Sequence, residues 1–110
     1  MSEVLIVYVT AADADEATRL GEAAVEARLA ACANVVAPVH SIYRWKGAVH
    51  RDTEHLLLLK TTRERLDALV ALVRSRHSYE TPEIIAVAAV GGSEAYLRWV
   101  AEETAPEETP

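Results

Sequence analysis

The chain has 110 residues, a net charge of −6 and a single cysteine. Its length predicts one domain with one core, and a hydrophobic content of 51% excludes a disordered chain. The acidic balance argues against nucleic acid and anionic membranes as partners, because both are bound through basic surfaces. No apolar stretch approaches the ~20 residues of a membrane span, and a lone cysteine suits a reducing compartment. We therefore expect a cytoplasmic protein.

The first third of the chain predicts a strand followed by a helix. Residues 4–10 form a continuous apolar run, which is typical of a central strand covered on both faces. Asp13 and Glu16 then have the spacing of a capping box, in which Asp13 accepts from the backbone N–H three residues on and Glu16 reaches back. One side of the helix carries small apolar residues, which predicts close packing on a sheet: Ala17, Leu20, Ala24, Ala27 and Ala31.

Residues 34–60 predict two long strands joined by a turn around Gly47. Odd positions of the first arm are mostly apolar from Val35 to Trp45, and the second arm ends in four consecutive leucines, so both of its faces need covering. Such a ribbon spans roughly 40 Å, whereas a domain of this size has a radius of gyration of only ~13 Å. We expect the tip to project and, with Tyr43 and Trp45 on it, to mediate homo-oligomerisation.

The register of this hairpin depends on its loop. A three-residue loop places Trp45 opposite Val49 and His40 opposite Glu54. A cross-strand polar pair of that kind is a simpler interpretation of His40 than a metal site. Pro38 leaves a second register open, because a proline within a strand often accompanies a bulge.

The rest of the chain predicts a helix, a strand and a last helix. Thr61 and Glu64 repeat the capping-box spacing before a helix whose apolar face is Leu66, Leu69, Val70 and Val73. Residues 83–90 predict a fourth strand, and Ser93 is placed to cap the final helix.

This order of elements predicts an α+β fold. Strand, helix, strand, strand, helix and strand in succession are typical of a ferredoxin-like βαββαβ sandwich, here with a long central hairpin and an extra C-terminal helix. Residues 1–104 are expected to form the single domain, and residues 105–110 an acidic flexible tail.

The candidate site lies between the predicted second helix and fourth strand. Residues 76–83 gather an imidazole, a phenol and two carboxylates in one loop, and binding groups are common in such loops. His77 with Glu80 is the first candidate for a metal site; in the alternative, His77 caps the helix and Tyr79 packs inward. Cys32 is interpreted as a packing residue rather than a reactive thiol. No nucleophile and base have suitable spacing, so we predict no catalytic residue and no enzyme.

Several segments together resemble the CutA family of divalent-cation tolerance proteins, along nearly the whole length from Leu5 to Val100. The resemblance is carried by residues 29–34, 41–47, Glu54, Lys60–Thr61, 77–83 and 96–99.

The resemblance implies a homotrimer of ferredoxin-like subunits, similar in assembly to PII-type signalling proteins, and a role in tolerance to copper and other divalent cations. A cleft between subunits would gather Tyr43, Trp45, Glu54, Lys60, Tyr79 and Glu83. The copper ligands of a bacterial member fall at Val9, Arg76 and His77, so one imidazole remains. No cofactor is expected to be required, and copper or another divalent cation would be bound weakly. The alternative function is a PII-like signalling or adaptor trimer with a small ligand at the subunit boundary.

Overall fold

The computed structural model describes residues 3–106, so most of the predicted tail, residues 107–110, lies outside them. Its elements follow one another as β1 (Val4–Ala11), α1 (Ala14–Glu26), β2 (Cys32–Trp45), β3 (Ala48–Thr62), the 3₁₀ turn η1 (Arg63–Arg65), α2 (Leu66–Arg76), β4 (Ile84–Ala88) and α3 (Glu94–Glu103). The strands form one antiparallel sheet in the order β2-β3-β1-β4. The predicted α+β fold and its order of elements are confirmed.

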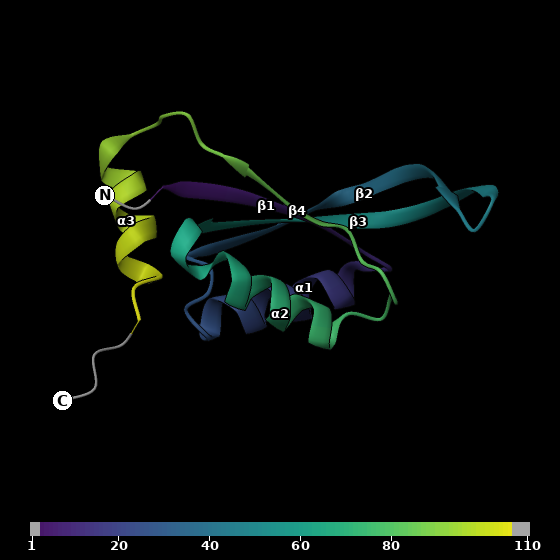
Figure 1. The fold of residues 1–110 in the computed structure, drawn as a ribbon, viewed down its shortest axis with the longest axis horizontal. Coiled ribbons are helices and arrows are strands. Elements are labelled where there is room, and N and C mark those ends of the chain that lie inside the picture. The colour runs from purple at the N-terminus through teal and green to yellow at the C-terminus, as the bar shows by residue number, and fades with distance from the viewer. Residues whose placement is uncertain (1–2, 107–110) are drawn as a thin grey trace.

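Helices α1 and α2 cover one face of the sheet, the opposite face carries neither, and α3 lies across one end (Figure 1). The covered face holds the core, in which Val7, Val9, Leu57 and Leu59 have no exposed surface. The alternate residues of the same strands, among them Ile6, Tyr8, Leu56 and Leu58, lie on the helix-free face and are half-buried. The molecule is thus a two-layer structure with one sheet face uncovered.

The first helix packs closely on the sheet, as its small residues predicted. Gly21 is buried, and a Cβ added there would lie 2.9 Å from the Cβ of Ala33 on β2. The helix ends at Glu26, earlier than expected, because Arg28 adopts a positive φ of 60° and turns the chain. Ala31 is therefore not part of the helical stripe; its N–H donates to the carbonyl of Lys60 at 2.8 Å.

The hairpin turn is shorter than predicted. Lys46 and Gly47 have φ values of 49° and 81°, so both turn residues are left-handed and the loop contains two residues, as in a type I′ turn. Trp45 consequently pairs with Ala48. The predicted three-residue loop is wrong.

The cross-strand pair predicted for His40 is wrong for the same reason. His40 pairs with Thr53, whose hydroxyl lies 3.5 Å from its Nδ1. Glu54 instead pairs with Val39.

A bulge interrupts β2 between Val36 and Pro38, which confirms the alternative that Pro38 had left open. One extra residue in a strand exchanges the two faces beyond it. Val35 pairs with Leu57 on the helix-covered face, whereas Tyr43 and Trp45 pair with His50 and Ala48 on the helix-free face. The prediction that all odd positions share one face is therefore wrong.

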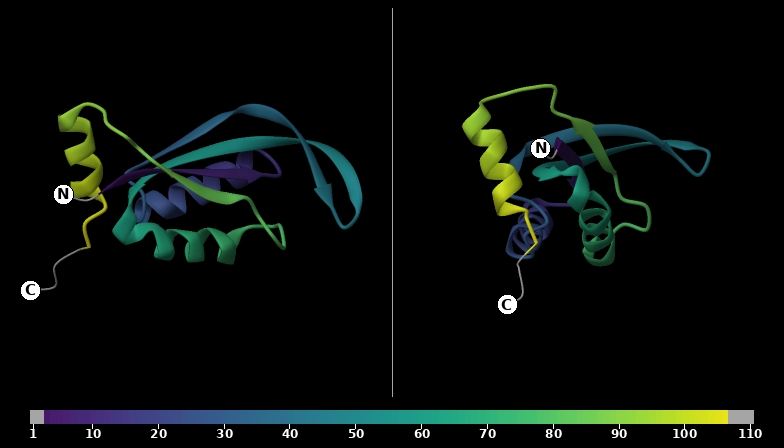
Figure 2. Two further views of the ribbon diagram at one scale, coloured as in Figure 1. Left: turned by 45° about the horizontal axis from the view of Figure 1, so that its top comes forward. Right: turned by 60° about the vertical axis from the view of Figure 1, so that its left-hand side comes forward.

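Beyond this bulge the hairpin extends away from the two helices (Figures 1 and 2). The principal extents of the molecule are 50 × 30 × 23 Å. Within residues 3–106, no buried hydrophobic residue falls between Ala30 and Leu57. The predicted projecting tip is confirmed, and it takes no part in the core.

The helix termini agree only partly with their predicted caps. The Ser93 hydroxyl accepts from the Tyr96 N–H at 3.4 Å, as predicted. The Thr61 hydroxyl is buried and donates to the Leu29 carbonyl at 2.6 Å, so Thr61 connects β3 to the α1–β2 turn and does not cap α2. Arg28 donates to the carbonyls of Glu102 and Ala105, each at 3.2 Å, which fixes the end of α3. In the described part of the chain, no helix is long and apolar enough to cross a membrane.

Candidate functional site

A cavity of about 370 Å³ opens where the hairpin meets the connection between α2 and β4. We call it the acidic cavity, because four of its lining residues are carboxylates and none is basic. It is lined by Thr10, Tyr43, Trp45, Asp52, Glu54, Tyr79, Glu80, Thr81 and Glu83. Glu54 is an odd number of residues away from the buried Leu57 and Leu59 on β3, so its side chain lies on the opposite, helix-free face of the sheet.

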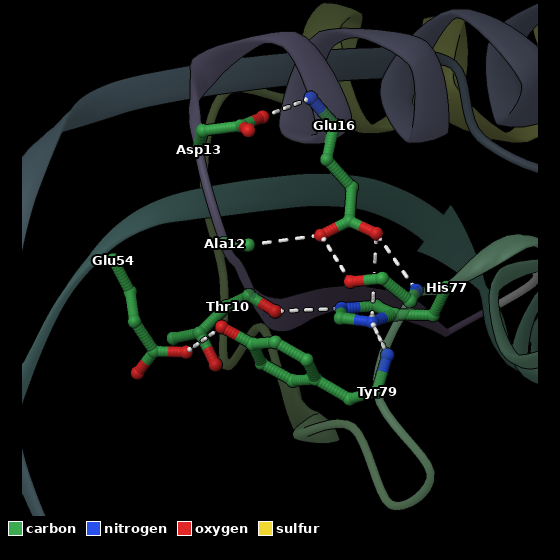
Figure 3. A network of polar contacts seen from close by, with 8 residues as sticks. Thr10, Ala12, Asp13, Glu16, Glu54, His77 and Tyr79 are labelled. Carbon is green, nitrogen blue, oxygen red and sulfur yellow. Dashed lines mark hydrogen bonds and ion pairs between the residues drawn. The ribbon is translucent and has the colours of Figure 1, made fainter.

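Tyr79 and Glu54 are among the more buried residues of the cavity lining, and Figure 3 shows their side chains pointing toward each other. The Tyr79 hydroxyl donates to Glu54 Oε2 at 2.8 Å, and Glu54 is only 7% exposed although it carries a carboxylate. Burial, followed by the neighbouring Glu54, raises the pKa of Tyr79. The phenol therefore remains protonated and holds one oxygen of Glu54 in place.

A second phenol and carboxylate form the outer wall. The Tyr43 hydroxyl donates to Asp52 Oδ2, and this hydrogen bond raises the pKa of Tyr43. The Tyr43 ring stacks on His50 with 5.5 Å between the ring centroids. Burial, followed by the charge of Glu54, raises the pKa of Glu83. The carboxylates of Glu54 and Glu83 therefore repel each other, and the cavity lining contains no cation that relieves this repulsion.

His77 lies behind the cavity wall and does not line the cavity. Its side chain is fully buried; Nε2 lies 2.8 Å from the Thr10 carbonyl, and Nδ1 accepts from the Tyr79 N–H at 3.0 Å. This hydrogen-bond network assigns the proton to Nε2, so neither nitrogen has a free lone pair. His77 is also the C-cap residue of α2, as the alternative interpretation proposed.

The structure separates His77 from Glu80, the two residues predicted to bind a metal ion together. Glu80 lines the cavity, whereas both ring nitrogens of His77 are engaged with backbone groups. Across residues 3–106, no group of three or more His, Cys, Asp or Glu side chains is positioned to hold a metal ion. A closed metal centre within one described chain is therefore not supported.

Glu16 is a structural residue of the site that the sequence pattern identified only as a cap. Its backbone N–H donates to Asp13 at 2.8 Å, as predicted, but its carboxylate accepts from the Ala12 N–H at 3.0 Å. The same carboxylate accepts from the N–H and the hydroxyl of Ser78, at 2.7 and 3.0 Å. Figure 3 shows how this joins the start of α1 to the connection that carries Tyr79. Ser78 is 62 positions away, so no local signal could have indicated this role.

Lys60 and Cys32 lie apart from the acidic cavity. Lys60 donates to the side-chain oxygen of Asn34, and the Cys32 thiol lies 3.7 Å from the same oxygen. Cys32 is half-buried at the start of β2. Of the six residues predicted for the inter-subunit cleft, five line the cavity and Lys60 does not. Asp52 was missed, although its position two residues before Glu54 places it on the same strand face.

The family model described as "CutA1 divalent ion tolerance protein" matches residues 5–103. A curated relative, the divalent-cation tolerance protein CutA of Thermus thermophilus, is 42% identical over 99 residues, which cover 90% of this chain and 96% of that protein. The chloroplastic CutA of Arabidopsis thaliana is 39% identical over 100 residues, which cover 91% of this chain. The chain spans 55% of the length of that plant protein and of the mouse CutA.

Solved structures of similar proteins share the fold. The CutA structure from Xylella fastidiosa has a TM-score of 0.91 at 33% identity, with 94% of this chain and 100% of that chain covered. The Thermus thermophilus structure has a TM-score of 0.90 at 41% identity, with 93% and 99% covered.

The same comparisons correct the predicted location. The A. thaliana relative is named as chloroplastic, and a similar structure from Archaeoglobus fulgidus, with 32% identity and a TM-score of 0.89, is named as periplasmic. Similar chains thus occur in other compartments, and the prediction of a cytoplasmic location is wrong.

Proposed function

Because the chain belongs to the CutA1 divalent ion tolerance protein family, we propose that it is a homotrimeric, non-enzymatic protein of divalent-cation tolerance. In this proposal the subunit is ferredoxin-like, in agreement with its sheet order of β2-β3-β1-β4 and its two helices on one face. The trimer would form through the helix-free face, whose half-buried apolar residues are covered by no second layer within residues 3–106. The cation would be held weakly in the acidic cavity.

The observation that carries the cation proposal is that four carboxylates, those of Asp52, Glu54, Glu80 and Glu83, line one cavity with no basic side chain in its lining. Because no three of them are positioned around one metal ion within residues 3–106, binding would be weak. Carboxylate oxygens bind divalent cations, and a bound cation would offset the burial and the charge of Glu54 that together raise the pKa of Glu83. The only thiol, Cys32, lies outside the cavity, so a soft site selective for Cu(I) does not fit these residues. Copper would therefore bind here as Cu(II), through the carboxylate oxygens that also bind other divalent cations.

Isothermal titration with Cu(II) and Zn(II) tests this proposal. We expect the double variant Glu80→Gln/Glu83→Gln to bind at least about tenfold more weakly than the wild type, because it removes two of the four cavity carboxylates. The matched control is Glu22→Gln/Glu26→Gln, which removes the same charge from exposed positions of α1. Equal isotherms for the cavity variant and the wild type would exclude the cavity as the cation site.

A second candidate function is a PII-like signalling or adaptor trimer that binds a small organic ligand at the same place. It is favoured by the aromatic side of the cavity, where Tyr43 and Trp45 are 40% and 38% exposed and available for stacking. A ligand-dependent increase in melting temperature that persists in the presence of a chelator would favour this function over cation binding.

A further inference from the structure

The two sides of the projecting hairpin carry opposite charges. Residues paired across an antiparallel ribbon point to the same side, so the register assigns each side chain to a side. Asp52 and Glu54 lie on the helix-free side, with the acidic cavity. The other side comprises the even-numbered residues 38–44 of β2 and the odd-numbered residues 49–55 of β3, which include two arginines, two histidines and no carboxylate. We call it the basic ribbon face.

Two arginines supply the fixed positive charge of this face. Arg44 is paired with Val49 and Arg51 with Ile42, so the arginines are diagonal neighbours, with Cα atoms roughly 7–8 Å apart. Within residues 3–106, neither guanidinium belongs to an ion pair. Like charges this close repel each other, and a carboxylate bound between them would offset the repulsion through charge-assisted hydrogen bonds.

Exposed aliphatic side chains occupy the other diagonal of the same two rows. Ile42 is 68% exposed and Val49 is 50% exposed. Along each strand an aliphatic residue and an arginine are therefore two positions apart, as Ile42 and Arg44 are on β2. The side chains on one side of an extended peptide have the same period of two residues. The pattern suits an extended segment that presents acidic and apolar side chains alternately.

A hollow of about 240 Å³ lies between two rows of this face. It is lined by His40, Ser41, Ile42, Arg51, Asp52 and Thr53. The Arg51 guanidinium and the Thr53 hydroxyl can donate hydrogen bonds to a carboxylate placed there. The carboxylate of Asp52 belongs to the opposite side of the ribbon, where it accepts from the Tyr43 hydroxyl. The hollow is thus suited to the end of one acidic side chain.

The basic ribbon face is left open by the rest of the subunit. Helices α1 and α2 lie against the main body of the sheet, and the ribbon extends beyond them (Figure 1). The homotrimer proposed above forms through the helix-free face, which is the other side of the ribbon. A docking surface on the basic side would therefore stay accessible in the assembled protein.

We propose that the basic ribbon face docks an acidic, extended segment of a partner protein. One carboxylate of that segment binds Arg51 at the hollow, another binds Arg44, and apolar side chains between them pack on Ile42 and Val49. Nucleic acid and anionic bilayers need a broader basic surface, and here Asp52 and Glu54 lie directly behind the arginines. This docking is independent of the cation and of the carboxylates of the acidic cavity.

Fluorescence anisotropy at low ionic strength tests this docking with a labelled peptide of repeating Glu-Glu-Val-Val units. In an extended conformation, each side of that peptide presents glutamate and valine alternately. We expect Arg44→Glu/Arg51→Glu to weaken binding at least about tenfold, and to bind instead the peptide in which lysine replaces glutamate. The matched control is Arg19→Glu/Arg74→Glu, which makes the same charge change at exposed positions of α1 and α2 and should bind like the wild type.

Several results would overturn the proposed docking. One is a wild type that does not bind the acidic peptide, or that binds it no better than the ribbon variant does. A labelled oligothymidylate or phosphatidylserine vesicles bound in preference to the peptide would assign the face to nucleic acid or to a membrane. Sedimentation of the ribbon variant as a monomer beside a trimeric wild type would make the face a subunit interface.

The cation proposal is tested separately. The cavity variant Glu80→Gln/Glu83→Gln should bind the acidic peptide at least as well as the wild type does, whatever its calorimetric titration with Zn(II) shows. Loss of peptide binding in that variant would place the peptide at the cavity and overturn the assignment to the basic ribbon face.

Discussion

At the scale of single residues, Glu16 shows how one buried carboxylate connects distant segments. Burial raises its pKa, but hydrogen bonds from Ala12 and from the hydroxyl and N–H of Ser78 outweigh this effect, so the pKa lies below its ordinary value of 4.5. A carboxyl whose pKa is lowered by folding stabilises the folded state at neutral pH. That contribution is lost as the pH falls below 4.5 and through the lowered pKa.

We predict that Glu16→Gln lowers the free energy of unfolding at pH 7 by about 1–3 kcal/mol, because hydrogen bonds to a charged acceptor are lost. The difference from the wild type should narrow as the pH falls below 4.5 and through the lowered pKa, because the unfolded chain takes up the proton first and the folded chain only at lower pH. Thermal melts from pH 7 to pH 3 measure this, with the exposed Glu22→Gln as control. A difference in unfolding free energy that stays constant down to pH 3 would show that the charge of Glu16 does not stabilise the fold.

The site residues were predictable from the sequence only where they share a segment or a strand face. Tyr79, Glu80 and Glu83 come from one loop, and their convergence followed from that loop alone. The inward position of His77 did not, because its acceptor, the Thr10 carbonyl, is 67 positions away. Hydrogen bonds of that span depend on tertiary packing, which residue spacing does not encode.

At the scale of elements, Gly21 determines how closely α1 approaches the sheet. A Cβ there would lie 2.9 Å from the Ala33 Cβ and 3.3 Å from Leu57 Cδ1. Alanine normally stabilises a helix interior relative to glycine by about 0.5–1 kcal/mol. Overpacking in a core costs about 1–3 kcal/mol, so the steric effect should prevail.

We therefore predict that Gly21→Ala lowers the free energy of unfolding by about 1–2 kcal/mol, which urea denaturation measures. The reciprocal variant Ala33→Gly removes the opposing methyl group. Combining it with Gly21→Ala should recover part of the loss, since the two Cβ atoms are in contact. A stabilised Gly21→Ala single variant would show that the helix moves outward without cost.

The elements themselves were largely predictable, because each has its own periodicity and caps. The four strands, the two core helices and the terminal helix all occur in the expected order. The hairpin register was not predictable, because it depends on a two-residue turn and on a bulge, and neither interrupts the alternation of apolar and polar residues in the sequence. Alternation in β2 is compatible with several registers, and only the pairing across β3 distinguishes them.

At the scale of the whole molecule, α3 and the hairpin tip lie at opposite ends of a 50 Å long body, and the core lies between them (Figure 1). The tip carries exposed Ile42, Tyr43, Trp45 and Val49 but contributes no buried apolar residue, so the subunit fold does not depend on it. The backbone amides of such an association surface should be protected from hydrogen exchange only when a partner covers them.

We predict that amide hydrogen exchange in residues 40–50 depends on protein concentration. Exchange should be slow in the assembled protein and at least about tenfold faster on dilution into the monomer, because the tip would then lose its partner. Amides of β1, which lies inside the sheet, serve as the internal control and should change far less. Equal exchange at the tip across concentrations would place the association surface elsewhere.

The bulge at Pro38 has one further consequence, for how the surface of such a molecule can diverge. Because the side of each residue in the outer ribbon is fixed by its partner on β3, deletion of the extra residue at the bulge would leave Tyr43 opposite His50 and Trp45 opposite Ala48. The buried half of the subunit would be unaffected by that change. The strand can thus gain or lose this one residue at the bulge while the outer ribbon keeps the same side chains on each side.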